Sequence, residues 1–199
     1  MNRSRVIKVL IKAMSKGDVG IFAGRPICAE AINSDRPGNL YLSRGAGAVS
    51  MAVGMAMSVE RRVFVFVSDE HFLMDLGELA HAASSKCDNL YVVLLVTGNY
   101  SLDTTPPTIY DTMPSMHGVL FNMGFIVHDY RRNFENNKNP VKEIRATLKK
   151  VRGPLAVIVR VANKVSSGVD IDEKKSIRNI TKFIKDKSIS PYVREDILF

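Results

Sequence analysis

Two short polar runs each follow directly on an uninterrupted apolar segment, and these are the positions where the sequence could perform chemistry. The run SDEH begins at Ser68 after the apolar residues 63–67, and TGN begins at Thr97 after residues 90–96. Asp69, Thr97 and Asn99 supply hard oxygen ligands. Mg²⁺ prefers such ligands and commonly takes one or two carboxylates, leaving its other positions to phosphate and water. The sequence therefore predicts a magnesium site at these three residues.

A diphosphate site is predicted beside this metal site. A helix beginning near Phe72 would direct its first N–H groups toward an anion there. The glycine-rich turn Gly45-Ala46-Gly47 would let the bare backbone approach the same ligand. Each pattern also has a plainer interpretation: SDE is typical of a helix N-cap followed by acidic first-turn residues, GAG of close packing, and TGN of a simple turn. The residues alone leave these alternatives open.

These side chains need a scaffold that brings the ends of two strands together. Apolar runs indicate strands at 19–23, 39–43, 63–67, 90–96, 125–128 and 155–161. Between these strands, apolar residues recur at helical spacing. They indicate an N-terminal helix around Val6–Met14 and further helices at 46–58, 72–85, 115–123, 140–151 and 173–187. Strands that are apolar throughout are covered on both faces. We therefore predict an α/β fold, a three-layer sandwich with a mainly parallel central sheet, in which ligands bind beyond the carboxyl ends of the strands.

Length and composition predict one folded domain with an extension. The chain has 199 residues, 46% of them hydrophobic, and a net charge of +8. We place the α/β domain at residues 1–163 and a basic helical extension at 164–199. No apolar run approaches the roughly 20 residues that cross a bilayer. The N-terminus lacks the apolar core of a signal peptide, and two scattered cysteines suggest a reducing compartment. We therefore expect a cytoplasmic protein without a membrane partner.

The net positive charge permits nucleic-acid binding, but the sequence has no nucleic-acid-binding motif. The segment 63–128, which holds the polar runs, is acidic, with seven acidic residues against one lysine. We therefore do not expect nucleic acid as a partner.

In their order along the chain, these segments resemble the diphosphate-binding (PP) half of thiamine-diphosphate enzymes. The likeness covers roughly residues 1–160 and is greatest to the β-subunit of sulfopyruvate decarboxylase and the C-terminal half of phosphonopyruvate decarboxylase. Its most specific phrase is FLMDLGELAHAA, beginning at Phe72. The other carrying segments are DRPGNLYL from Asp35, the turn at Gly45–Gly47, and NLYVVLLVTGNY from Asn89.

The resemblance implies a subunit of a decarboxylase that acts on a small anionic 2-oxo acid with thiamine diphosphate and Mg²⁺. It implies a glutamate that activates the cofactor, carried by a pyrimidine-binding (PYR) domain for which this chain has no room. We therefore expect a hetero-oligomer with a PYR-type subunit, or a homo-oligomer. No catalytic residue is identified in this chain. The resemblance implies that Asp69, Thr97 and Asn99 hold the metal, and that the cofactor contacts are Gly45, Ala46, Gly47, Met51, Ser68, Glu70 and His71.

The sequence departs from the family pattern at the site itself. Ser68 and Glu70 replace the two glycines that flank the family aspartate, and Thr97 stands where the family has a metal-binding asparagine. The family has a bulky apolar residue that holds the cofactor in its bent form, and here the small Ala46 lies near that position. Met51 is a possible replacement for it. These departures keep two alternatives open. One is a non-catalytic binding or assembly subunit on the same fold, and the other is half of a thiamine-diphosphate carboligase or oxidoreductase. If the chain is a decarboxylase subunit, the segment 101–110 is expected to act as a lid.

Overall fold

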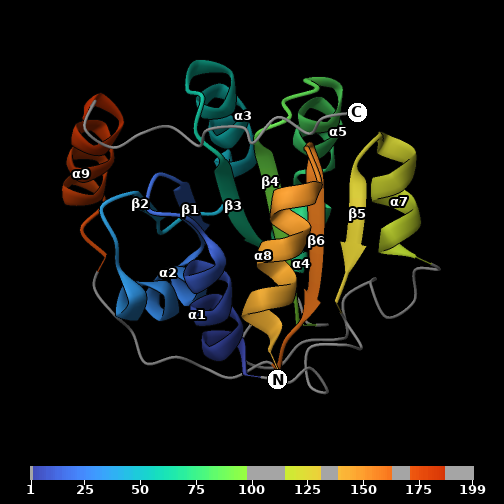
Figure 1. The fold of residues 1–199 in the computed structure, drawn as a ribbon, viewed down its shortest axis with the longest axis horizontal. Coiled ribbons are helices and arrows are strands. Elements are labelled where there is room, and N and C mark those ends of the chain that lie inside the picture. The colour runs from blue at the N-terminus through green and yellow to red at the C-terminus, as the bar shows by residue number, and fades with distance from the viewer. Residues whose placement is uncertain (1, 98–114, 131–138, 163–170, 187–199) are drawn as a thin grey trace.

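A six-stranded parallel sheet forms the centre of the molecule, as the computed structural model shows for residues 2–97, 115–130, 139–162 and 171–186 (Figure 1). The strands follow the order β2-β1-β3-β4-β6-β5, and every neighbouring pair is parallel. Their bounds are β1 Val19–Ala23, β2 Asn39–Leu42, β3 Val63–Ser68, β4 Leu90–Val96, β5 Ile126–Asp129 and β6 Leu155–Arg160. The predicted α/β fold with a parallel sheet is confirmed.

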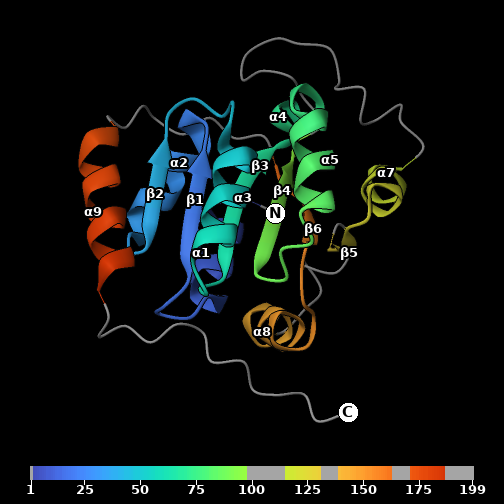
Figure 2. The same ribbon diagram turned by 90° about the horizontal axis from the view of Figure 1, so that it is seen from above.

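Helices cover both faces of this sheet. One face carries α1 (Arg3–Ala13), α2 (Arg25–Ala31) and α8 (Pro140–Lys150). The other carries α3 (Ala48–Ser58), α4 (Asp69–Met74), α5 (Leu76–Ser84) and α7 (Met116–Met123). Figure 2 shows α3 and α5 side by side in front of the sheet and α9 (Glu173–Lys185) beside the edge strand β2. A single 3₁₀ turn, η1 (Ile32–Ser34), follows α2.

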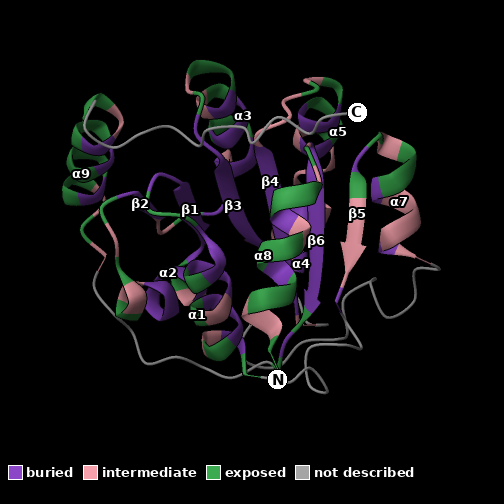
Figure 3. Ribbon diagram, viewed as in Figure 1, coloured by how far each residue is buried: buried purple, intermediate pink, exposed green. Residues whose placement is uncertain are grey.

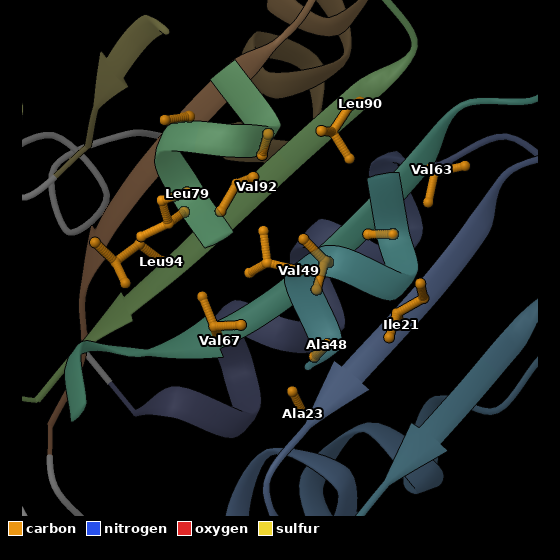
Figure 4. Close-up of a cluster of buried hydrophobic side chains, with 14 of the residues drawn as sticks. Ile21, Ala23, Ala48, Val49, Val63, Val67, Leu79, Leu90, Val92 and Leu94 are labelled. Carbon is orange, nitrogen blue, oxygen red and sulfur yellow. The ribbon is translucent and has the colours of Figure 1, made fainter. Parts of the chain in front are cut away.

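The strands divide their side chains between two cores because successive residues of a strand point to opposite faces. Along β3, Val63, Val65 and Val67 join the core under α3 and α5, part of which Figure 4 shows. Phe64 and Phe66 join the core under α1, α2 and α8. There Phe66 stacks on Phe22 with ring centroids 4.5 Å apart. Figure 3 shows the central strands buried along their length, as expected for a sheet covered on both faces.

A buried ion pair joins β1 and β3 at their N-terminal ends. The guanidinium of Arg62 donates to both carboxylate oxygens of Asp18, at 3.0 Å from Nε and 2.6 Å from Nη2. Asp18 is fully buried and Arg62 is 4% exposed. A bidentate pair of this kind fixes the register of the two segments, because losing either partner would strand a charge in the interior.

The helix α9 covers the free edge of β2. The backbone N–H of Tyr41 donates to Ser176 Oγ at 2.8 Å, and the N–H of Ser43 donates to the Glu173 carboxylate. Ile180 and Phe183 pack into the core under α3. The helix therefore satisfies backbone groups that an edge strand otherwise leaves open to pairing with another chain. The domain division at residues 163 and 164 stays a prediction.

Two local elements differ from the sequence prediction. The helix predicted at 72–85 is two helices, α4 and α5, because the backbone leaves the helical conformation at Asp75, with φ −113° and ψ 31°. The helix α2 was not predicted, because seven residues are too few to establish a helical pattern. It follows Gly24, whose φ of 90° suits glycine, and has Pro26 in its first turn. Within the described ranges, no helix is both long and apolar enough to span a membrane.

Candidate functional site

The ends of β3 and β4 bring Asp69 and Thr97 into direct contact. Thr97 donates to the Asp69 carboxylate twice, from its backbone N–H to Oδ2 at 3.2 Å and from Oγ1 to Oδ1 at 3.0 Å. The contact follows from parallel pairing, since Ser68 lies opposite Leu95 and the chain leaves both strands at the same edge. Asp69 is fully buried. Two of the three predicted metal ligands are therefore adjacent, whereas Asn99 lies outside the described residues.

The site lies where the strand order changes direction. From β1 the chain crosses to β2 on one side, and it then returns to β3 and β4 on the other. In open parallel sheets this reversal leaves a crevice beyond the carboxyl ends of the central strands, where ligands bind. Gly24 follows β1, the turn at Gly45 follows β2, and Ser68 ends β3, so three loops meet at this crevice.

The imidazole of His71 ties these three loops together. Its Nδ1 lies 2.8 Å from Ser68 Oγ. A Cβ atom added at Gly45 would lie 1.8 Å from His71 Nε2, and one at Gly24 would lie 3.3 Å from Cε1. The ring thus rests on the bare backbone of Gly45 and comes close to Gly24. Sequence reasoning missed Gly24, and only its place directly after an apolar strand could have pointed to it.

The other predicted cofactor contacts lie on the loop after β2, on α3 and on α4. Gly47 is the N-cap of α3 with a φ of 79°, a left-handed conformation that favours glycine. Ala46 is exposed and Met51, in the first turn of α3, is 41% exposed. Glu70 is half-buried in the first turn of α4. No hydrogen bond within the described part of the chain joins Met51 or Glu70 to the Asp69–Thr97 pair.

Two carboxylates lie where α4 meets α5. The pKa of Asp75 is raised by partial burial and by the neighbouring carboxylate of Glu78. Glu78 in turn accepts from the backbone N–H of Ser50 at 3.1 Å, which joins α5 to the first turn of α3. This contact fixes α3, and with it the glycine-rich turn, relative to α4 and α5.

The donor set fits magnesium better than it fits a bare diphosphate cradle. A carboxylate and a neutral hydroxyl at adjacent strand ends suit Mg²⁺, which takes few protein ligands when it also binds phosphate. Among the residues placed by the structure, no group of three or more His, Cys, Asp or Glu could bind a metal ion by protein side chains alone. At Gly45 the space is taken by the His71 ring. A diphosphate there would meet an imidazole and a serine hydroxyl as well as main chain.

Comparisons with known proteins agree with this geometry. Residues 24–157 match the family "Thiamine pyrophosphate enzyme, C-terminal TPP binding domain". Over 94 residues, 47% of this chain, the sequence is 37% identical to the sulfopyruvate decarboxylase subunit beta of Methanothermobacter thermautotrophicus. That alignment spans 50% of the relative's length.

Two solved structures share the fold. One is a protein of Mycobacterium smegmatis assigned as a thiamin diphosphate-dependent enzyme, with a TM-score of 0.61 and 17% identity over 81% of this chain. The other is the benzoylformate decarboxylase of Polynucleobacter necessarius, with a TM-score of 0.62 and 13% identity over 82% of this chain. This chain spans about a third of each, 32% and 33%. The family match covers most of the chain and contains both strand ends of the site, so the chain belongs to the family of C-terminal TPP-binding domains of thiamine pyrophosphate enzymes.

Proposed function

We propose that this chain is the diphosphate-binding subunit of a thiamine-diphosphate- and Mg²⁺-dependent 2-oxo acid decarboxylase of the sulfopyruvate or phosphonopyruvate type. The observation that carries the proposal is the contact of Asp69 with Thr97 at the ends of adjacent parallel strands. The contact lies inside the family match. The similarity to a sulfopyruvate decarboxylase beta subunit supports the decarboxylase class.

In this proposal the chain binds and orients the cofactor, and the cofactor supplies the electron sink for loss of CO₂. Asp69 and Thr97 hold the metal, together with the predicted ligand Asn99. Ser68 and His71, which share a hydrogen bond, contact the diphosphate oxygens from the crevice between β1 and β3. Burial of Asp69 would strengthen the attraction between its carboxylate and the metal.

The proposed partner is a PYR-type subunit, and α3 and α5 offer a surface for it. The exposed positions of these two helices include no acidic residue, lysine or arginine; they are Ser50, Met51, Gly54, Met57, Ser58, Gly77, Ala80, His81 and Ser84. Met57 is 71% exposed. The half-buried Glu78 is the one acidic residue of these two helices, and a face whose exposed positions lack charged residues suits a protein interface.

The test is calorimetric titration of thiamine diphosphate, with and without Mg²⁺, into the chain combined with its proposed PYR-type subunit. We expect Mg²⁺-dependent binding that weakens by more than about tenfold in D69N, since the substitution removes the one carboxylate proposed as ligand. The matched control is D88N, at the opposite end of β4. Absence of binding by the unsubstituted complex would refute the proposal, as would equal affinity in D69N and D88N.

A second function is favoured by one observation. Ser68 and Glu70 flank Asp69 where the family has glycines, and the His71 ring lies on Gly45. These features would suit a non-catalytic assembly subunit whose cofactor site has degenerated. In that case the triple variant S68G/E70G/T97N should bind thiamine diphosphate with Mg²⁺ while the unsubstituted chain does not. Tight binding by the unsubstituted chain would exclude this alternative.

A further inference from the structure

A second cavity lies far from the Asp69 edge of the sheet. It has a volume of about 740 Å³ and opens between α9 and the turn that leads into β2. Its lining includes Asn39, the first residue of β2. Because the strands are parallel, the start of β2 lies at the opposite edge of the sheet from the ends that carry Asp69 and Thr97. The cavity is therefore separate from the proposed cofactor site, and its function does not depend on that proposal.

Arg36 brings a partly buried cation to this cavity, and the carboxylate that acts on it, Asp18, is already paired with Arg62. Its Nη2 donates to the carbonyl oxygens of Ser15 at 2.7 Å and Asp18 at 2.6 Å. Its Nη1 is shielded from solvent and has no hydrogen-bond partner in the described chain, where no carboxylate forms an ion pair with its guanidinium. Burial lowers the pKa of Arg36, so the surroundings disfavour its charge. An anionic oxygen beside this guanidinium would supply the missing acceptor.

Two lysines add positive charge from the opposite wall. Lys175 and Lys182 are seven residues apart on α9, so both project from one face of the helix into the cavity lining. Neither ammonium forms an ion pair with a residue that the structure places. Three cations therefore line the cavity, together with three aspartates.

The lining also holds three acidic residues, and two of them accept hydrogen bonds within the chain. Asp35 accepts from the Tyr41 hydroxyl at 2.6 Å, and Asp172 accepts from the Lys175 backbone N–H as the N-cap of α9. Asp186 is the C-cap of the same helix. The side-chain amide of Asn39 is 2% exposed; it donates to the Tyr41 hydroxyl, and its Oδ1 has no partner among the described residues. This oxygen is shielded from solvent and lies toward β1, where a Cβ atom added at Gly20 would be 3.1 Å away.

We propose that this cavity binds a small organic anion, a phosphate monoester or a carboxylic acid with an apolar body. Arg36, Lys175 and Lys182 hold its charged end. Phe183 and Ile171 line the cavity beside its apolar part. The α9 segment lies beyond the family match, which ends at residue 157, so the site is a property of this chain's own extension.

The test is a titration of the full chain with phenyl phosphate in the absence of thiamine diphosphate, followed by amide chemical shifts. We expect saturable binding with shifts at Tyr41 and Ser176, and weaker binding of inorganic phosphate, which lacks the apolar body. The double variant K175Q/K182Q should bind phenyl phosphate about fivefold more weakly or worse. It should still fold, since both side chains are on the exposed side of α9.

The matched control is K174Q/K185Q, which removes the same charge from exposed positions of the same helix outside the cavity lining. Retained binding in this control supports the site. Equal loss in both double variants would show attraction to net charge alone and overturn the proposal. Shifts confined to residues around His71, unchanged in K175Q/K182Q, would place phosphate in the proposed cofactor site and equally overturn it. Absence of saturable binding of both phenyl phosphate and benzoate would do the same.

Discussion

At the scale of single residues, the site depends on side chains that meet across strand ends. Asp69 and Thr97 are 28 positions apart in sequence, yet they are joined by two hydrogen bonds. His71 is held by Ser68 Oγ and by the absence of a side chain at Gly45. The position of the imidazole therefore depends on a glycine in another loop, so substitutions at positions 45 and 71 should be energetically coupled.

Gly45→Ala should displace the His71 ring, because the new Cβ would lie 1.8 Å from Nε2. We expect a loss of about 1–3 kcal/mol in the free energy of unfolding, the usual cost of an overpacked contact. In an H71A background the same change should cost clearly less, with a coupling energy above ~0.5 kcal/mol. Urea denaturation of the two single variants and the double variant measures this. Gly54→Ala is the control, since no atom lies within 4 Å of its added Cβ. Additive effects of G45A and H71A would contradict the contact.

At the scale of elements, α9 acts as the cover of an edge strand. The pKa of Glu173 is lowered because its carboxylate accepts hydrogen bonds from the side chain and backbone of Ser43. The stabilisation is therefore fully present above the ordinary glutamate pKa, about 4.3, and is lost as the pH falls through the lower value of the folded state. Below that value the protonated carboxyl no longer favours the contact.

Glu173→Gln should therefore lower stability at pH 7 by about 1 kcal/mol or less, since the group is near the surface. The difference between E173Q and the unsubstituted chain should shrink as the pH falls below about 4. Denaturant unfolding at several pH values measures it, with E60Q as a control at an exposed site. A difference that is constant from pH 7 to pH 3 would contradict the role of the carboxylate.

Elements with a long sequence pattern were predicted correctly. Features that depend on a few residues were missed. The apolar run of β4 and the helix α3 were predicted because seven or more residues repeat one pattern. The break at Asp75 was missed because the apolar spacing continues across it from Phe72 to Leu79. The Asp18–Arg62 pair and the Gly24 contact with His71 depend on which strands are neighbours, which a single sequence does not contain. The meeting of Asp69 with Thr97 was predictable only because both end long apolar strands.

At the scale of the whole molecule, the two faces of the sheet differ in what they offer to a partner. On one face, α8 presents exposed charges such as Lys142, Glu143 and Arg145. On the other, the exposed positions of α3 and α5 lack lysine, arginine and acidic residues. A face of this kind beside the proposed site is suited to a subunit that completes it.

Met57→Lys should prevent stable association with the PYR-type subunit, because a charge would be buried in an uncharged interface. We expect affinity for the partner to fall by about a hundredfold or more, with little change in the stability of the chain alone. Ile177→Lys is the matched control, since Ile177 is also exposed but lies on α9 at the edge of the sheet. Analytical ultracentrifugation of each mixture measures association. Unchanged association of M57K would exclude this face as the interface.

The most direct test of the proposed site is the location of its metal. A crystal of the chain with its partner, grown with thiamine diphosphate and Mn²⁺ in place of Mg²⁺, would reveal the ion by its anomalous scattering. We expect one peak within direct coordination distance, roughly 2 Å, of the Asp69 carboxylate and next to Thr97. Bound cofactor with its metal away from Asp69 would refute the proposed metal site, as would a crevice between β1 and β3 that stays without cofactor at saturating concentration.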